Sequence, residues 1–332
     1  MKLRLSVVLL GCIVALIVAV LVALSFGSDD VSLVRAITDA ASGDHDIVFG
    51  VRLPRVLLGV IAGAGLSVVG VALQALLRNP LAEPYVLGVS GGSALGASVA
   101  ILAGFSGMSA FGASVVPLFA LAGGAGATFV VYACAAVAPG SRSISMLLAG
   151  VIVNAVASAA ITFIKTLVTQ STTQELLFWL MGFLDFPLSR ASLVMLAIYV
   201  AVGTAVLLVD AARLNVLSLG ESAAEHLGVN VRALERRTLF ASSLVVGAIV
   251  SVTGLIGFVG FIVPHVLRRL LGPDVRVLMP ASIALGGAAL VTCDLASRAS
   301  FRLIHREPPV GAVTAIVGGV LFFVVLLRGR GR

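Results

Sequence analysis

The chain has 332 residues, of which 60% are hydrophobic and 11% are charged, and glycine supplies a further 36. A soluble domain carries about 25% charged residues, so this chain has too few polar side chains to cover a globule in water. Its 22 basic and 15 acidic residues lie between long apolar runs, as loop charges of membrane proteins do. They do not gather on one face as in nucleic-acid-binding proteins. We therefore expect an all-α polytopic membrane protein, one domain over residues 1–332, in contact with lipid and without a nucleic-acid partner.

The first apolar run, residues 5–26, follows two basic residues. The apolar core of a signal peptide is about 7–15 residues long, whereas about 20 residues are needed for a helix to cross about 30 Å of hydrocarbon. The length of the run therefore indicates a retained membrane-spanning helix. Cys12 within it, like Cys134 and Cys293 in later runs, lacks ligand spacing, which predicts core residues and no metal site.

Nine apolar runs are long enough to cross a membrane: 5–26, 54–77, 86–104, 112–138, 144–168, 191–209, 239–257, 277–296 and 310–327. A tenth run, residues 258–271, is shorter and contains Pro264. Both termini are basic, through Lys2, Arg4, Arg328, Arg330 and Arg332. The positive-inside tendency places both ends in the cytoplasm, which requires an even number of crossings. We therefore expect about ten transmembrane helices.

This topology leaves several arginines outside the membrane, against the usual charge bias. They stand at the start of the second span and in the last outer loop, residues 297–309: Arg52, Arg55, Arg298, Arg302 and Arg306. Two interpretations are open. The arginines can snorkel or pair with acidic loop residues such as Asp44, Asp46 and Glu307, or they can form a cationic rim that docks an acidic partner.

The charges within the spans separate transporter classes. Carriers driven by protons or ions usually place ionisable residues near the middle of the membrane, but here Asp210 and Asp294 stand at the ends of apolar runs. The same pattern disfavours a membrane transferase, which needs a buried acid–base pair. A phosphate-binding loop needs lysine after glycine, and neither Lys2 nor Lys165 follows one. We therefore expect no catalytic residue and no ATP site in this chain, so any ATPase is a separate polypeptide.

One span carries a regular polar stripe. In the run 144–168, small polar residues recur every four positions and share one helical face: Asn154, Ser158, Thr162 and Thr166. Such a stripe either makes hydrogen bonds between helices or lines an aqueous pathway. The sequence leaves both interpretations open.

The longest cytoplasmic connection, residues 210–238, contains a short helical pattern between two glycines at about 219–230. Ala223, Ala224 and Leu227 are expected on its apolar face, with Glu221 and Glu225 on the polar side. Because the chain must borrow an ATPase, this helix is a candidate docking element. The residues expected to couple it are Leu219, Gly220, Glu221, Ala224, Leu227 and Gly228.

Several blocks resemble the permease family of siderophore, haem and vitamin B12 ABC importers, and they run in the family's order across nearly the whole chain. They are RLPR at 52–55, QALLRNPLAEP at 74–84, LGVSGG at 87–92, LGESAAEHLGV at 219–229, GFVGFIVPH at 257–265, DLASR at 294–298 and EPPVG at 307–311. The resemblance implies ten helices per subunit. It also implies two permease subunits around a central pathway, two cytoplasmic ATP-binding subunits and a substrate-binding protein outside.

The resemblance also assigns roles to residues. It implies a pathway lined in part by the fifth helix, which carries the polar stripe, and a coupling helix at 219–230. The family's docking arginines, which meet glutamates of the binding protein, match Arg52 and Arg55, and the Asp-x-x-x-Arg pattern matches Arg298. Arg302 is an additional arginine of the same loop.

The resemblance therefore implies a multi-pass permease of the bacterial cytoplasmic membrane, expected as a homodimer, that imports an iron chelate such as a siderophore or haem. The binding protein is expected to be periplasmic or lipid-anchored. We expect no cofactor on this chain, with ATP and Mg bound by the partner ATPase subunits. Vitamin B12 is the alternative substrate. A secondary carrier without an ATPase is the alternative from another class.

Overall fold

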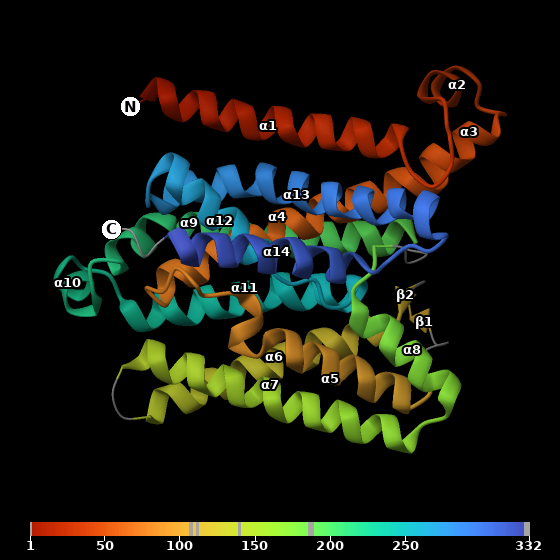
Figure 1. Ribbon diagram of the computed structural model, residues 1–332. Helices are drawn as coiled ribbons and strands as arrows, with labels where there is room; N and C mark the ends of the chain where they lie inside the picture. The colour runs from red at the N-terminus through yellow and green to blue at the C-terminus, as the bar shows by residue number, and fades with distance from the viewer. Residues whose placement is uncertain (1, 106–108, 111–112, 139–140, 185–188, 329–332) are drawn as a thin grey trace.

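The computed structural model describes residues 2–105, 109–110, 113–138, 141–184 and 189–328. These residues form a bundle of long helices that run roughly along one common direction (Figure 1). The strands among them are two-residue pieces, β1 (Ser109–Ala110) and β2 (Ala113–Ser114), which pair antiparallel. The expected all-α membrane fold is confirmed.

Each of the ten predicted apolar runs contains or overlaps a helix. These are α1 (Lys2–Ser25), α4 (Leu53–Leu76), α5 (Val89–Leu102), α6 (Val116–Val137), α7 (Arg142–Leu167), α9 (Arg190–Leu217), α11 (Val231–Thr253), α12 (Val259–Leu271), α13 (Val275–Ile304) and α14 (Val310–Arg328). Within the described residues, seven segments are long and apolar enough to cross a membrane, and α5 and α14 are shorter apolar helices. The tenth, α12, has 13 residues and contains Pro264.

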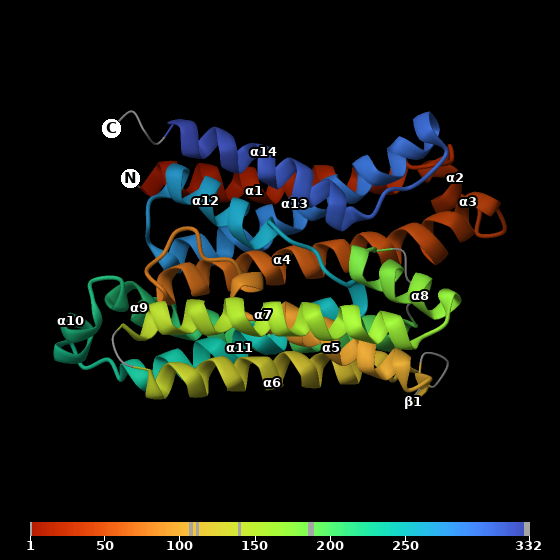
Figure 2. The same cartoon turned by 60° about the horizontal axis from the view of Figure 1, so that its bottom comes forward.

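Short elements join these helices. On the way to α4 lie α2 (Leu33–Thr38), α3 (Gly43–His45) and the π-helix η1 (Asp46–Arg52), and the 3-10 helix η2 (Pro84–Leu87) precedes α5. Helix α8 (Gln170–Met181) follows α7, and α10 (Glu221–His226) follows α9. The start of α1 and the end of α14 lie at the end of the bundle that carries α10, whereas α2, α3 and α8 lie at the other end (Figures 1 and 2). Both ends of the described chain are therefore on one side, as an even number of crossings requires.

Three helices extend well beyond their predicted apolar runs. Helix α9 continues to Leu217, α11 begins at Val231, and α13 continues to Ile304. The loop predicted at 297–309 is therefore wrong for most of its length. Hydropathy ends where the apolar side chains end, but helical hydrogen bonding continues because helix-forming polar residues are well tolerated in water.

Helix α4 lies at the centre of the bundle, against α13 on one side and α12 on another (Figure 2). A Cβ at Gly63 would lie 2.2 Å from the carbonyl oxygen of Gly286, and one at Gly70 would lie 1.7 Å from that of Gly260. Glycine lets the backbones touch at both crossings, the packing typical of membrane helices. Close contact rather than side-chain size therefore sets the position of α4.

The outermost helices bury little of their apolar surface within the chain. Only 11% of the most apolar window of α1 is buried, and 22% in each of α7 and α9. Exposed side chains such as Val14, Ile152 and Val202 point away from the bundle. These faces suit lipid or a second subunit, the surroundings expected of a membrane protein.

Candidate functional site

The polar stripe lies on α7, and three of its four members are exposed. Thr162 donates its hydroxyl to the carbonyl oxygen of Ser158 at 2.9 Å, and Thr166 donates to that of Phe163 at 2.7 Å. Their hydroxyls are satisfied within α7 and, among the described residues, make no hydrogen bond to another helix. The stripe is thus open to an aqueous pathway or a second subunit. Its pathway role stays a prediction.

Asn154, the half-buried member of the stripe, links α7 to η2. Its side-chain amide donates to the carbonyl oxygen of Tyr85 at 2.6 Å. Two residues earlier, the Glu83 carboxylate accepts a hydrogen bond from the backbone N–H of Phe258. Phe258 has a left-handed backbone, with φ of 68°, and is the N-cap residue that precedes α12. Sequence reasoning missed Glu83, although it lies inside the block at 74–84 that carries the family resemblance.

The predicted docking arginines lie together at the end of the bundle opposite α10, and we call Arg52, Arg55, Arg298 and Arg302 the outer arginine cluster. Arg55 and Arg298 share the carboxylate of Asp294, at 2.9 and 3.0 Å. Arg55 also binds Glu307 at 3.0 Å. The side chains of Arg55, Asp294 and Arg298 are only 9%, 1% and 4% exposed.

The cluster also binds the end of α1. Arg52 donates to the carbonyl oxygens of Leu24 at 2.9 Å and Ser25 at 3.0 Å. Arg298 donates to that of Ala23 at 3.1 Å, and Arg302 donates to that of Gly27 at 3.0 Å. The last carbonyls of a helix have no partner within it and attract cations. The arginines supply those partners.

The structure separates the predicted docking arginines by position and exposure. Arg298 and Arg302 lie on the last turns of α13 and not in a loop, which corrects the prediction. Asp294 lies inside α13 and not at its end, but it is neutralised by two arginines. The pairing predicted for Glu307 is present. Among the four cluster arginines, only Arg302 is substantially exposed, at 44%, in an ion pair with Asp30 at 2.6 Å.

The predicted coupling helix is shorter than expected, since α10 spans only Glu221–His226 within 219–230. It begins after Gly220, whose φ is 117°, and Gly228, whose φ is 82°, follows it. Ala224 is fully buried, whereas Leu219 and Leu227 are 69% and 64% exposed. Leu227 is therefore displayed rather than packed with Ala224 on one buried face.

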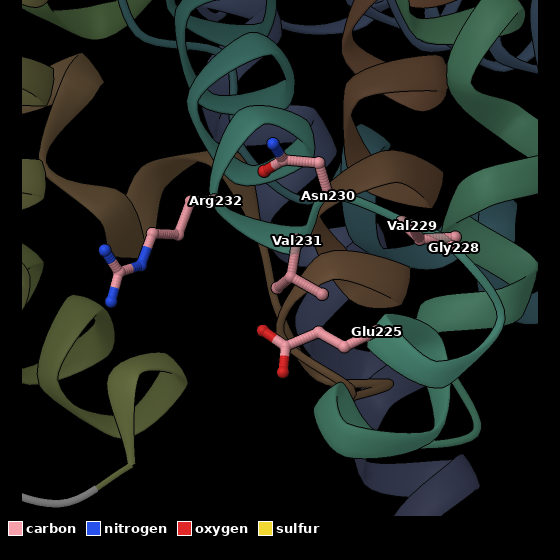
Figure 3. A pocket seen from close by; sticks show the side chains of 6 residues that line it. All are labelled: Glu225, Gly228, Val229, Asn230, Val231 and Arg232. Carbon is pink, nitrogen blue, oxygen red and sulfur yellow. The ribbon is translucent and has the colours of Figure 1, made fainter.

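An open pocket of about 400 Å³ lies where α10 meets α11. It is lined by Glu225, Gly228, Val229, Asn230, Val231 and Arg232. In Figure 3 the carboxylate of Glu225 and the guanidinium of Arg232 extend to the same side of the ribbon. The exposed side chain of Leu227, next to this polar pocket, offers a surface to which a protein partner can bind.

Ion pairs tie this end of the bundle together. Glu221 on α10 binds Arg78 at 2.7 Å, and Glu235 on α11 binds Arg142 at 3.0 Å. The buried Asp210 is paired with Arg213 and with Arg237, so it is not a free carboxylate of the carrier type. The pairs of Arg78 with Glu221 and of Arg142 with Glu235 join residues far apart in the sequence, which is why local patterns did not reveal them.

Asp274 caps the start of α13 at the same end. Its carboxylate accepts from the side-chain amide of Asn215 at 2.6 Å and from the guanidinium of Arg276 at 2.8 Å. The hydrogen bond from Arg276 is the main cause that lowers the pKa of Asp274 to about 2, with Asn215 adding to it. The Oδ1 atom of Asn215 in turn accepts from the N–H of Val275 at 2.8 Å.

The free cysteines differ in their surroundings. Cys12 is buried, Cys293 is half-buried and Cys134 is exposed. The prediction of a core position is thus wrong for Cys134, which lies on an outward face of α6. Within the described residues no group of three His, Cys, Asp or Glu side chains is placed to hold a metal ion.

Comparisons with known proteins agree with this architecture. A model of the FecCD transport family matches residues 15–328. The chain is 42% identical over 287 residues to the cobalamin import system permease protein of Halobacterium salinarum, which covers 86% of this chain and 74% of that protein. It is 35% identical over 286 residues to the hemin transport system permease protein of Yersinia pestis, which covers 86% of this chain and 84% of that protein.

A solved structure extends the likeness to the fold. An inward-facing metal-chelate type ABC transporter superposes with a TM-score of 0.84 at 30% identity, over 97% of this chain and 99% of that one. The chain therefore belongs to the FecCD transport family and is a permease of an ABC importer of that type.

Proposed function

We propose that this chain moves an iron chelate, either a siderophore complex or haem, across the bacterial cytoplasmic membrane with both of its termini in the cytoplasm. The observation that carries the proposal is the family match over residues 15–328, which takes in nearly all of the helical bundle. The relative named for hemin transport supports this substrate class. Cobalamin is the second candidate because the relative named for cobalamin import is 42% identical.

The transporter is proposed to contain two copies of this chain around a central pathway. The exposed members of the stripe on α7 support this assembly, because they contact no other helix through the bonds described for this chain. In the proposed dimer, Asn154, Ser158, Thr162 and Thr166 line the pathway. The low buried fraction of α7 is consistent with a second subunit.

Two ATP-binding subunits are proposed to bind the α10 end, where Leu219 and Leu227 are exposed and Leu227 adjoins the pocket. These subunits hold ATP and Mg, and this chain binds no cofactor. A periplasmic or lipid-anchored binding protein is proposed to dock at the opposite end. There, Arg302 offers an accessible guanidinium, and Arg52, Arg55 and Arg298 hold the surface beneath it in shape.

In the proposed cycle, closure of the two ATP-binding subunits displaces α10 in each copy, and the copies rock about their interface. The central cavity then opens alternately outward and inward. This chain breaks no bond. Its contribution is the different stability of two packings, and the free energy comes from ATP on the partners.

The test is ATP hydrolysis by this chain in nanodiscs with its candidate ATPase, with Glu221→Arg/Leu227→Asp compared with the wild type. We expect the wild type to form an active complex and the variant, although folded, to lose it. Lys165→Gln, far from α10, is the matched control. If no ATPase associates, or if the variant behaves as the wild type does, the carrier interpretation replaces this one.

The substrate is tested separately in proteoliposomes that contain the complete complex. Uptake of a ferric siderophore, haem and cobalamin is compared with and without ATP, each with its purified binding protein. ATP-dependent uptake of one of the iron chelates supports the proposal. ATP-dependent uptake of cobalamin alone moves the assignment to the second candidate.

A further inference from the structure

Two ion pairs at the α10 end connect helices that the sequence keeps apart. Arg78, just after α4, binds Glu221 on α10 at 2.7 Å. The Nε atom of Arg142, the first residue of α7, lies 3.0 Å from a carboxylate oxygen of Glu235 on α11, an ion pair without the alignment of a hydrogen bond. One pair therefore joins the proposed coupling helix to α4, and the other joins α11 to the helix that carries the polar stripe.

The two pairs differ in burial. Arg78 and Glu221 are 34% and 38% exposed, whereas Arg142 and Glu235 are 19% and 5% exposed. Exposed pairs contribute little because water competes for both partners. A buried carboxylate that loses its partner is strongly unfavourable. The Arg78–Glu221 pair is thus easily released, and the Arg142–Glu235 pair is held together through a movement.

The Arg142–Glu235 pair has further support. The guanidinium of Arg142 lies 5.2 Å from the centre of the Tyr132 ring, so α6 also holds it in place through a cation–π contact. Within the described residues, this is the ion pair that connects α7 with α11. A displacement of α11 that carries Glu235 must therefore carry Arg142 or leave a charge buried without a partner.

The connection between α10 and α11 is short. Ala224 anchors α10 in the bundle, and only residues 227–230 separate the two helices. The side chain of Asn230 accepts from the N–H of Ala233 at 3.0 Å and caps the start of α11. A displacement of α10 therefore displaces α11 as well, because the linker between them is only about as long as one helical turn.

We propose that Arg142 and Glu235 are positioning residues that transmit the displacement of α10 to α7, while Arg78 and Glu221 form a latch that holds α10 against α4 until an ATPase engages it. Asn154 lies 12 positions after Arg142, which is about 18 Å along α7. A shift at the start of α7 therefore moves the whole polar stripe. This inference rests on the proposed function.

The experiment uses the complete complex with its ATPase and binding protein in proteoliposomes and measures uptake and ATP hydrolysis together. Arg142→Gln and Glu235→Gln are expected to lower the number of substrate molecules moved per ATP by about tenfold, within the usual range of coupling between sites. Hydrolysis stimulated by the binding protein continues. Arg276→Gln, which removes an exposed pair at the same end, is the matched control.

Charge rescue separates a positioning role from a structural one. The exchange Arg142→Glu/Glu235→Arg, and the conservative Arg142→Lys if the exchange does not fold, are expected to restore the ratio of uptake to hydrolysis. Single variants that keep the wild-type ratio overturn the relay while the proposed function stands. A wild-type complex without ATP-driven uptake overturns both.

The latch makes a separate prediction. Arg78→Gln is expected to raise ATP hydrolysis measured without binding protein by several-fold, because α10 is no longer held against α4. Unchanged or lower basal hydrolysis overturns the latch. Thermal unfolding of each variant in detergent identifies any variant whose change reflects a loss of folded protein.

Discussion

The two ends of the bundle hold their charges in opposite ways. At the outer end, Arg55 and Arg298 are buried around Asp294, and Arg52 and Arg298 bind the last carbonyls of α1. At the α10 end, Glu221 and Asp274 make ion pairs that are at least one-third exposed. A buried network is costly to break, and an exposed pair is not. The outer end is therefore built to stay fixed, and the α10 end is built to move.

Two carboxylates at the α10 end are buried exceptions, Asp210 and Glu235, and the Arg142–Glu235 pair is the one that joins α11 to α7. In the proposed mechanism this pair transmits the displacement of α11 to α7, so it has to stay intact. The comparison thus extends to function: a fixed surface suits docking of a soluble protein outside, and a releasable one suits a partner that works in cycles.

The largest effect is expected from Asp294→Asn. This substitution leaves Arg298 buried without a carboxylate and leaves Arg55 with the carboxylate of Glu307, and the expected loss of stability is about 3–5 kcal/mol. Unfolding by denaturant in detergent measures it. Glu307→Gln, which removes the more exposed partner of Arg55, is the control with a smaller loss. A loss below that of the control would show that the outer network is not a fixed unit.

The next effect concerns the end of α1. Arg52→Ala leaves the carbonyls of Leu24 and Ser25 without this donor, at an expected cost of about 1–3 kcal/mol. Because α1 buries little of its surface, its outer part should separate from α13. Faster modification of the buried Cys12 by a membrane-permeant thiol reagent reports this, in a chain with Cys134→Ala and Cys293→Ala. Arg35→Ala, an exposed outer arginine, should leave the rate unchanged.

A smaller effect, with a defined pH dependence, belongs to Asp274. Its pKa of about 2 in the folded chain lies below its usual value of 3.8. The charge therefore stabilises the folded state fully above pH 3.8, and this contribution is lost as the pH falls towards 2. Asn caps helices as well as Asp does, so Asp274→Asn removes only the charge. The variant should be less stable than the wild type at pH 7 and closer to it at pH 3. A constant difference would contradict this.

The smallest effect on stability is expected from Arg302→Ala. The Arg302–Asp30 pair is exposed, and such pairs contribute about 0–1 kcal/mol. If docking uses the accessible arginine, the affinity of the binding protein should nevertheless fall, and salt should weaken wild-type binding more than variant binding. Surface plasmon resonance at two ionic strengths measures both. Asp30→Asn is the control, because it frees Arg302 without removing it.

The sequence predicted the helices better than their ends. Apolar runs alone located α1, α4 and α7 because lipid forces each span to be long, apolar and helical. The same signal failed at the end of α13, where Arg298 and Arg302 continue the helix beyond the apolar residues. It also predicted too long a helix at 219–230, because glycine marks the limits of a segment and not the number of its helical residues.

The candidate sites divide in the same way. The stripe on α7 follows from the helical period, and the family follows from the order of the blocks, so the sequence by itself determined both. Only the tertiary structure showed that Arg55 pairs with Asp294, that the Glu83 carboxylate accepts from the N–H of Phe258, and that Arg142 pairs with Glu235. Each of these contacts joins residues more than 90 positions apart. Local periodicity carries no information on such pairs, because the packing of whole helices decides which side chains meet.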